Sequence, residues 1–137
     1  MIEIGFHTDA FNSSYWNFEK CLQWAQENDV PYIECGTIDG VSWLHGLGYQ
    51  PHVSLTEDPL ALRRKMEDYG VKFSQLDAAY PVSAPDGPSL GLTYILNSIR
   101  WAKLVGCDHI DTTDLMSKPE GMSDEEVLEM MKGIYEK

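Results

Sequence analysis

A short run of β-forming residues is followed by a stretch with helical periodicity four times along the chain, and this alternation constrains the fold more than any other feature. The β-like runs begin about 30–40 residues apart, which is the length of one βα unit; they are Ile2–His7, Tyr32–Gly36, Val71–Asp77 and His109–Thr113. Strands separated by helices run parallel and are joined by right-handed crossovers. The sequence therefore predicts an α/β protein with a parallel sheet.

The helical stretches have apolar residues three or four positions apart, together with clear start and stop signals. Asp58 and Pro59 form an N-cap followed by proline at the first helical position, and Gly70 suits the C-terminal end of that helix. Ser123 followed by Glu126 is a capping box. These signals predict amphipathic helices, each with one apolar face for the sheet.

The first two strands favour one of two competing architectures. Alternate residues Ile2, Ile4 and Phe6 are apolar, whereas Glu3, Gly5 and His7 are small or polar; Ile33 and Cys35 likewise alternate with Glu34 and Gly36. A doubly wound sheet is covered on both faces, so its strands are apolar nearly throughout. A (βα)₈ TIM barrel has helices outside only, and its inner face turns polar near the mouth. We favour the barrel, with a flavodoxin-like binding domain as the alternative.

Length limits this interpretation, because 137 residues hold only four βα units. A complete barrel has about 250 residues. We therefore expect residues 1–137 to form a single, incomplete domain, the N-terminal half of a TIM barrel. A four-stranded open sheet with helices on one side would expose its inner face and two edges. The chain should then need a second half-barrel or an oligomeric partner.

The charge and cysteine pattern exclude several classes of function. Lys and Arg number 10 against 22 Asp and Glu, a formal net charge of −12, which argues against nucleic acid and anionic membranes as partners. No apolar stretch approaches the ~18 residues of a membrane span. The cysteines are odd in number and widely spaced, and they are Cys21, Cys35 and Cys107. This pattern predicts reduced, buried thiols in a cytoplasmic protein.

The candidate functional residues follow the strands. His7 at the end of the first run could face a substrate as hydrogen-bond donor or acid–base group, or could instead cap the following loop. Glu34 inside the second run must have a partner or face a polar mouth, because an unpaired buried carboxylate is costly. Trp43 and His45 lie in a long aromatic loop that could bind a sugar ring or fold over its own apolar cluster. Asp77 ends the third run.

Several segments together resemble the xylose-isomerase-like superfamily of sugar phosphate isomerases and epimerases. They are IEIGFHTDAF, WAQENDVPYIECG, LRRKMEDYGVKFSQLDAAYP and SIRWAKLVGCDHIDTTD. The resemblance implies a TIM barrel that isomerises, epimerises or dehydrates sugars or inositol derivatives with one divalent metal, often Mn²⁺. It also implies that the metal ligands lie on the fifth to eighth strands, outside this chain. His7, Glu34, Trp43, His45 and Asp77 would then be contacts to a sugar or polyol substrate.

Two alternatives remain open at this point. One is a non-catalytic half-barrel that assembles with itself or with a complementary subunit. The other is the flavodoxin-like binding domain. The apurinic-endonuclease branch of the same fold is disfavoured by the charge and by Asp77, which stands near where that branch would place a histidine ligand.

Overall fold

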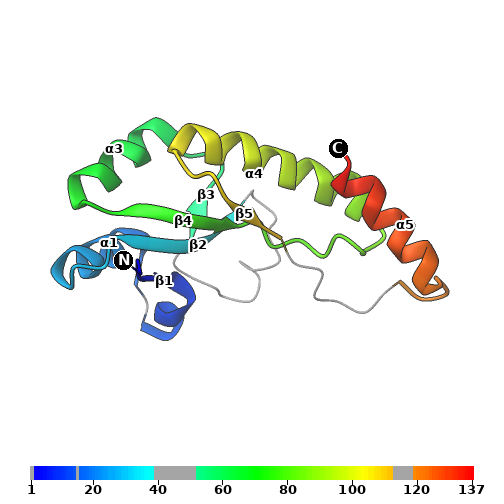
Figure 1. The fold of residues 1–137 in the computed structure, drawn as a ribbon, viewed down its shortest axis with the longest axis horizontal. Helices are drawn as coiled ribbons and strands as arrows, with labels where there is room; N and C mark the ends of the chain where they lie inside the picture. Colours follow the sequence, from blue (N-terminus) through cyan, green and yellow to red (C-terminus); the bar gives the residue numbers. More distant parts are fainter. Residues whose placement is uncertain (1, 15, 39–51, 113–118) are drawn as a thin grey trace.

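The chain has a mixed α/β fold around one parallel sheet (Figure 1). The computed structural model describes residues 2–14, 16–38, 52–112 and 119–137. Four strands follow one another across the sheet in chain order: β1 (Gly5–His7), β2 (Tyr32–Ile38), β4 (Lys72–Asp77) and β5 (Ile110–Asp111). A fifth, β3 (Val53–Ser54), pairs with the last residues of β2. Each described pairing is parallel, as the sequence predicts.

Four α-helices are described, and the capping signals predicted for two of them are formed. The four helices are α1 (Phe18–Glu27), α3 (Pro59–Tyr69), α4 (Leu92–Val105) and α5 (Asp124–Tyr135). The Asp58 side chain accepts hydrogen bonds from two amides of the first turn of α3, and the Ser123–Glu126 capping box is formed in both directions. Gly70 and Gly106 end α3 and α4 with φ values of 69° and 90°, which favour glycine.

Two further helical segments are short. A 3₁₀ segment, η1 (Thr8–Ser14), follows β1 directly. A π-helical turn, η2 (Gly87–Gly91), precedes α4. Gly87 is required there, because a Cβ at this position would come within 1.9 Å of the Val82 carbonyl oxygen.

The main hydrophobic core lies between the sheet and the helices. Ile33, Cys35 and Leu76 are fully buried and share this face of the sheet by strand alternation and register. Their cluster also contains residues of α1, α3 and α4, namely Leu22, Ala25, Leu62, Met66, Trp101, Ala102 and Val105. Three helices therefore share one core with a single face of the sheet.

Contacts between the helices agree with this arrangement. Figure 1 shows α3 and α4 along one side of the sheet, and the two helices pack against each other. On α1, Phe18 stacks on Phe73 of β4 with the ring centroids 5.8 Å apart. Glu19 of the same helix accepts a hydrogen bond from Lys65 of α3 at 3.1 Å. Helix α1 thus lies beside α3.

A smaller core joins α5 to the start of α4 and the loop after β4. It contains Ala78, Val82, Tyr94, Ile95 and Ile134. The predicted buried state of the cysteines is confirmed, since Cys21, Cys35 and Cys107 are buried free thiols. Among the described residues, no helix has the length and apolar character needed to cross a bilayer.

The N-terminal strand differs from the prediction. Alternation predicts that Ile2 and Ile4 pack under the helices, but their exposed fractions are 91% and 68%. β1 begins only at Gly5 and lies at the edge of the sheet, so no described neighbouring element covers the preceding residues. The prediction of packing for Ile2 and Ile4 is wrong.

Candidate functional site at the carboxyl ends of the strands

Four acidic or basic side chains lie on the face of the sheet opposite the helices. The register pairs His7 with Glu34, Gly36 with Asp77, and Asp77 with Asp111. Paired residues in a parallel sheet share a face, as do residues two apart on one strand. His7, Glu34, Asp77 and Asp111 therefore all belong to this face. His7, Asp77 and Asp111 are the last residues of their strands, and Glu34 lies within β2 beside His7.

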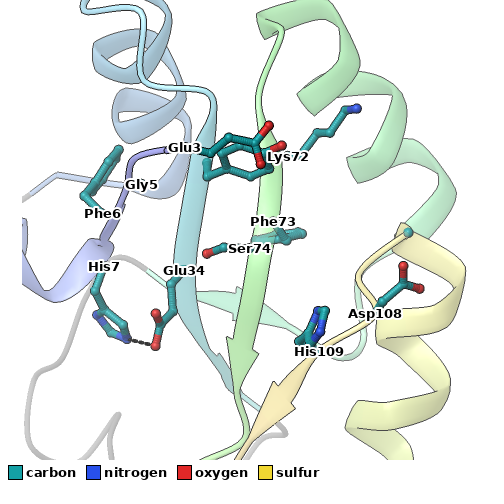
Figure 2. A pocket seen from close by; sticks show the side chains of 12 residues that line it. Glu3, Gly5, Phe6, His7, Glu34, Lys72, Phe73, Ser74, Asp108 and His109 are labelled. Carbon is teal, nitrogen blue, oxygen red and sulfur yellow. Dashed lines mark ion pairs between the residues drawn. The ribbon is translucent and has the colours of Figure 1, made fainter. Parts of the chain in front are cut away.

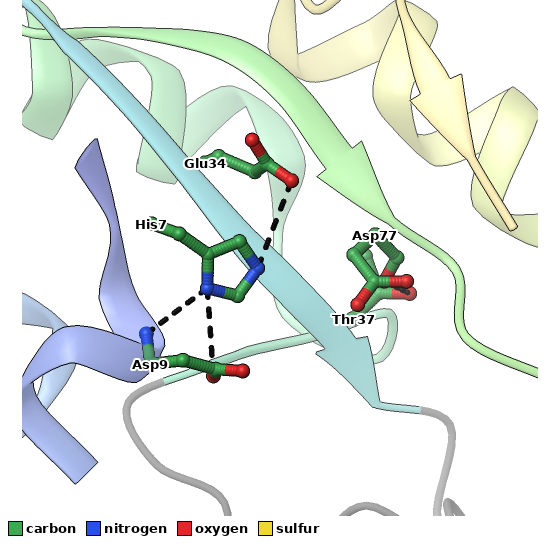
Figure 3. A network of polar contacts seen from close by, with 5 residues as sticks. All are labelled: His7, Asp9, Glu34, Thr37 and Asp77. Carbon is green, nitrogen blue, oxygen red and sulfur yellow. Dashed lines mark hydrogen bonds and ion pairs between the residues drawn. The ribbon is translucent and has the colours of Figure 1, made fainter. Parts of the chain in front are cut away.

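His7 stands between two carboxylates from different elements (Figure 3). Its Nε2 lies 3.7 Å from Oε1 of Glu34 on β2, and its Nδ1 lies 3.5 Å from Oδ1 of Asp9 on η1. The backbone N–H of Asp9 also donates a hydrogen bond to Nδ1 at 3.0 Å. η1 begins directly after β1, and this places both the backbone amide and the carboxylate of Asp9 at Nδ1 of the ring. His7 is therefore held from both sides.

Asp77 is the carboxylate with the most perturbed titration. Burial raises its pKa to about 6, the nearby Asp111 carboxylate adds to the increase, and His7 opposes it. Its Oδ1 atom is buried and has no hydrogen-bond partner among the described residues. The protonated form of Asp77 is consequently favoured well above the pH at which an aspartate ordinarily ionises.

Asp9 and Asp111 are shifted in the same direction. Burial is the main cause of the raised pKa at both positions, Glu34 adds to it, and His7 opposes it. No ion pair joins a lysine or arginine to Asp9, Glu34, Asp77 or Asp111 within the part of the chain that the structure describes. The group, which we call the acidic edge (His7, Asp9, Glu34, Asp77 and Asp111), is thus rich in acceptors and has His7 as its basic side chain.

An open hollow of about 730 Å³ lies on the same face and reaches the acidic edge at His7 and Glu34 (Figure 2). Its remaining lining comes from the amino-terminal parts of the strands and the loop before β5, and includes Lys72, Ser74 and His109. Asp9, Asp77 and Asp111 do not line it. The hollow and the acidic edge are therefore neighbours that share two side chains.

Buried hydroxyl groups fix the strand ends beneath the acidic edge. The Tyr94 hydroxyl of α4 donates to the Thr37 carbonyl oxygen at 2.6 Å and also lies 2.6 Å from the Thr37 hydroxyl oxygen. The Thr37 hydroxyl reaches Ser98 Oγ and the Asp77 carbonyl oxygen, both at 3.4 Å. This network ties the ends of β2 and β4 to α4.

The structure brings together three of the five residues predicted as substrate contacts. His7, Glu34 and Asp77 share the acidic edge, whereas Trp43 and His45 lie outside the described residues. Sequence reasoning did not select Asp9 or Asp111 as site residues. Asp111 could have been found from strand alternation, because it follows Ile110 as Asp77 follows Leu76. Asp9 depends on the turn into η1, for which the sequence has no comparable signal.

The composition of the acidic edge also raises the question of a metal site. Among the described residues, no group of three or more His, Cys, Asp or Glu side chains is arranged to hold a metal ion. The carboxylates are instead distributed over three strands and η1.

Comparison of the chain with protein-family models, with curated proteins and with solved structures found no match. The function is therefore inferred from the geometry of the polar face.

Proposed function

We propose that this chain is the substrate-side half of a metal-dependent sugar isomerase, epimerase or dehydratase with a (βα)₈ barrel. The acidic edge would bind a sugar or polyol at the barrel mouth. The catalytic metal, Mn²⁺ or a similar divalent ion, would be held by residues outside this chain. The observation that carries the proposal is a set of polar side chains at the carboxyl ends of β1, β4 and β5 and within β2, on the face that the helices leave open.

The strand order supports the barrel rather than the flavodoxin-like alternative. β1, β2, β4 and β5 step across the sheet in one direction. With right-handed crossovers, a constant direction puts every connecting helix on the same face. A doubly wound sheet requires the order to reverse, and its ligand binds where it does so. The order of the described strands has no reversal.

The chemistry of the acidic edge suits a polyhydroxylated ligand. Ionised carboxylates accept hydrogen bonds from sugar hydroxyls, whereas a protonated carboxyl or an imidazole N–H donates to a sugar oxygen. Asp77, with a pKa of about 6, populates both forms around pH 6 and keeps a minor protonated fraction at neutral pH. His7 and Asp77 could therefore each donate or accept a proton, which the interconversion of a hydroxyl and a carbonyl requires.

The metal contributes Lewis acidity in the proposed complete enzyme, where it would polarise the substrate carbonyl. We assign the acidic edge to substrate binding and proton handling. The three buried free thiols support a reducing compartment, and we propose the cytoplasm.

Nuclear magnetic resonance titration with a panel of aldoses, ketoses and inositols tests the proposal. We expect members of the panel to shift the backbone amide signals of His7, Glu34 and Asp77 at millimolar concentrations. Glu34→Gln should weaken the response several-fold. Glu129→Gln is the matched control, because Glu129 pairs with Lys132 on α5, on a helix that contributes no residue to the acidic edge.

Two results would overturn the proposal. One is a panel in which no member shifts the acidic-edge signals, or in which every shift lies on the helices. The other is tight, stoichiometric Mn²⁺ binding by the 137-residue chain in calorimetry, because the metal ligands would then belong to this chain.

Assembly is a second candidate function, favoured by the exposed Ile2 and Ile4 beside the edge strand β1. A non-catalytic half-barrel could bury these residues and its polar face against a second subunit. Light scattering separates the two proposals. A homogeneous dimer whose formation is lost in Ile2→Ser/Ile4→Ser supports assembly, and a monomer in both forms excludes assembly with itself.

A further inference from the structure

The contacts of the His7 ring determine where its proton lies. Three groups surround the ring nitrogens: the backbone N–H of Asp9 and the carboxylate of Asp9 at Nδ1, and the carboxylate of Glu34 at Nε2 (Figure 3). Of these, the backbone N–H is a donor, and an ionised carboxylate is an acceptor. The two sides of the ring are therefore chemically different.

We infer that the Asp9 backbone amide holds His7 in the neutral tautomer that carries its proton on Nε2, so that this N–H is directed toward Glu34. A ring nitrogen that accepts a hydrogen bond must have a free lone pair, so Nδ1 is unprotonated while the 3.0 Å bond from the Asp9 amide exists. The remaining ring proton is then on Nε2. The nearest carboxylate oxygen, Oε1 of Glu34, lies 3.7 Å away, which is an ion-pair distance that a small movement would shorten to a hydrogen bond.

Asp9 can also form a hydrogen bond with the protonated ring, through its carboxylate. A second proton can enter only at Nδ1, where it breaks the bond from the Asp9 amide, because two donors would then face each other. The Asp9 carboxylate lies 3.5 Å from the same nitrogen and can accept that proton's hydrogen bond. The titratable groups that surround His7 are Asp9 from η1, Glu34 from β2, Asp77 from β4 and Asp111 from β5. One residue, Asp9, thus has a partner for each protonation state of the ring.

Asp9 is therefore a positioning residue for His7. With respect to the substrate, this assignment rests on the proposed function, in which the Nε2–H of His7 would donate a hydrogen bond to a sugar oxygen in place of Glu34, without transfer of the proton. The tautomer itself does not depend on that function. It follows from the contacts of the ring and can be measured without any ligand.

Nitrogen-15 chemical shifts of the imidazole rings test the inference directly. In a long-range ¹H–¹⁵N spectrum of the full 137-residue chain above the pH at which the ring is protonated, His7 should show Nδ1 in the range of an unprotonated ring nitrogen and Nε2 in the range of a protonated one. The His7→Gln variant identifies the signals by their loss. A wild-type spectrum with the opposite assignment, or with both nitrogens at averaged values, overturns the inference without any other variant.

Two substitutions at Asp9 distinguish the effect of its backbone amide from the effect of its carboxylate. Asp9→Pro removes the amide donor, and proline is tolerated in the first turn of a helical segment such as η1. It should bring the His7 nitrogen shifts together, as tautomer exchange averages them. Asp9→Asn retains the amide and should retain the separated shifts. Unchanged shifts in a folded Asp9→Pro variant would also contradict the inference.

Failure of this inference is distinguishable from failure of the proposed function. A fixed tautomer without any response to sugars leaves the positioning role intact and removes the sugar-binding role. A response to sugars together with averaged nitrogen shifts supports the sugar-binding role and removes the positioning role of Asp9.

Discussion

The two faces of the sheet differ in chemistry although they belong to the same short strands. The helix-covered face presents Ile33, Cys35 and Leu76, each with an exposed fraction of 0%. The open face presents Glu34, Ser74 and Asp77, which are exposed or only partly buried. Burial of the apolar face is the main stabilising contribution. The open face is left free for polar groups whose protonation can be tuned by their neighbours.

The two faces are therefore expected to have different roles, the covered face in stability and the open face in ligand binding. Substitutions on the covered face should change the free energy of unfolding strongly. Substitutions on the open face should change it little, or even favourably, and should affect ligand binding instead. The connection between the faces is the Thr37–Tyr94 network, which holds the strand ends from the helix side.

The largest expected effect comes from emptying the covered face. Ile33→Ala should lower the free energy of unfolding by about 2–5 kcal/mol, because the site is fully buried and a cavity would remain. Ser74→Ala on the exposed face of β4 is the control and should change it by no more than about 0.5 kcal/mol. Urea denaturation followed by circular dichroism measures both. Equal changes in the free energy of unfolding at the two positions would contradict the stated difference between the two faces.

A smaller loss is expected where the two faces are connected. Tyr94→Phe removes the donor to the Thr37 carbonyl oxygen and should cost about 1–3 kcal/mol, because polar groups would remain buried without that partner. The matched change Tyr135→Phe affects a tyrosine that is 60% exposed and should be nearly neutral. If Tyr94→Phe were also neutral, the network would not fix the strand ends.

The smallest expected change in the free energy of unfolding is a gain, and it comes from a substitution on the open face. The pKa of Asp77 is about 6 in the folded chain against an ordinary value of 3.8, so the folded state binds the proton more tightly. Its contribution to the free energy of unfolding is complete below pH ~4 and is lost as the pH rises through about 6. Relative to wild type, Asp77→Asn should therefore gain stability as the pH rises from about 5 to about 7.5, by about 1 kcal/mol after allowance for solvent screening.

Urea denaturation at several pH values measures this change. Asp68→Asn on the exposed surface of α3 is the matched control and should follow the wild-type pH dependence. If the free energy of unfolding of Asp77→Asn followed the same pH dependence as wild type, Asp77 would not be the group that causes this dependence.

Most of the fold was accessible from the sequence because its signals are local. The caps at Asp58 and Ser123 and the glycine end at Gly70 lie where the sequence predicts them, and alternation in β2 identifies its buried face. The packing prediction for the first strand is wrong because alternation cannot reveal whether a neighbouring element exists to cover a residue. Ile2 and Ile4 have the pattern of a buried face but lie before the edge strand.

The candidate site was predictable in part for the same reason. His7, Glu34 and Asp77 were selected because each is a polar residue at or within a predicted strand. Asp9 was missed as a site residue because its role depends on the path of the backbone after β1, where the amide turns back onto the His7 ring. The raised pKa of Asp77 depends mainly on burial and then on Asp111, which is distant in sequence and adjacent only through strand pairing. Such nonlocal neighbours require the fold.

Thiol reactivity tests the difference between the two faces most directly. The three native cysteines are buried, so the wild-type chain should react slowly with a disulfide reagent such as dithionitrobenzoate in the absence of denaturant. Ser74→Cys places one thiol on the exposed face of β4, beside the hollow, and should add one rapidly reacting thiol per chain. A protected thiol at position 74, or rapid reaction of Cys35 in the folded wild-type chain, would contradict the assignment of a covered apolar face and an open polar one.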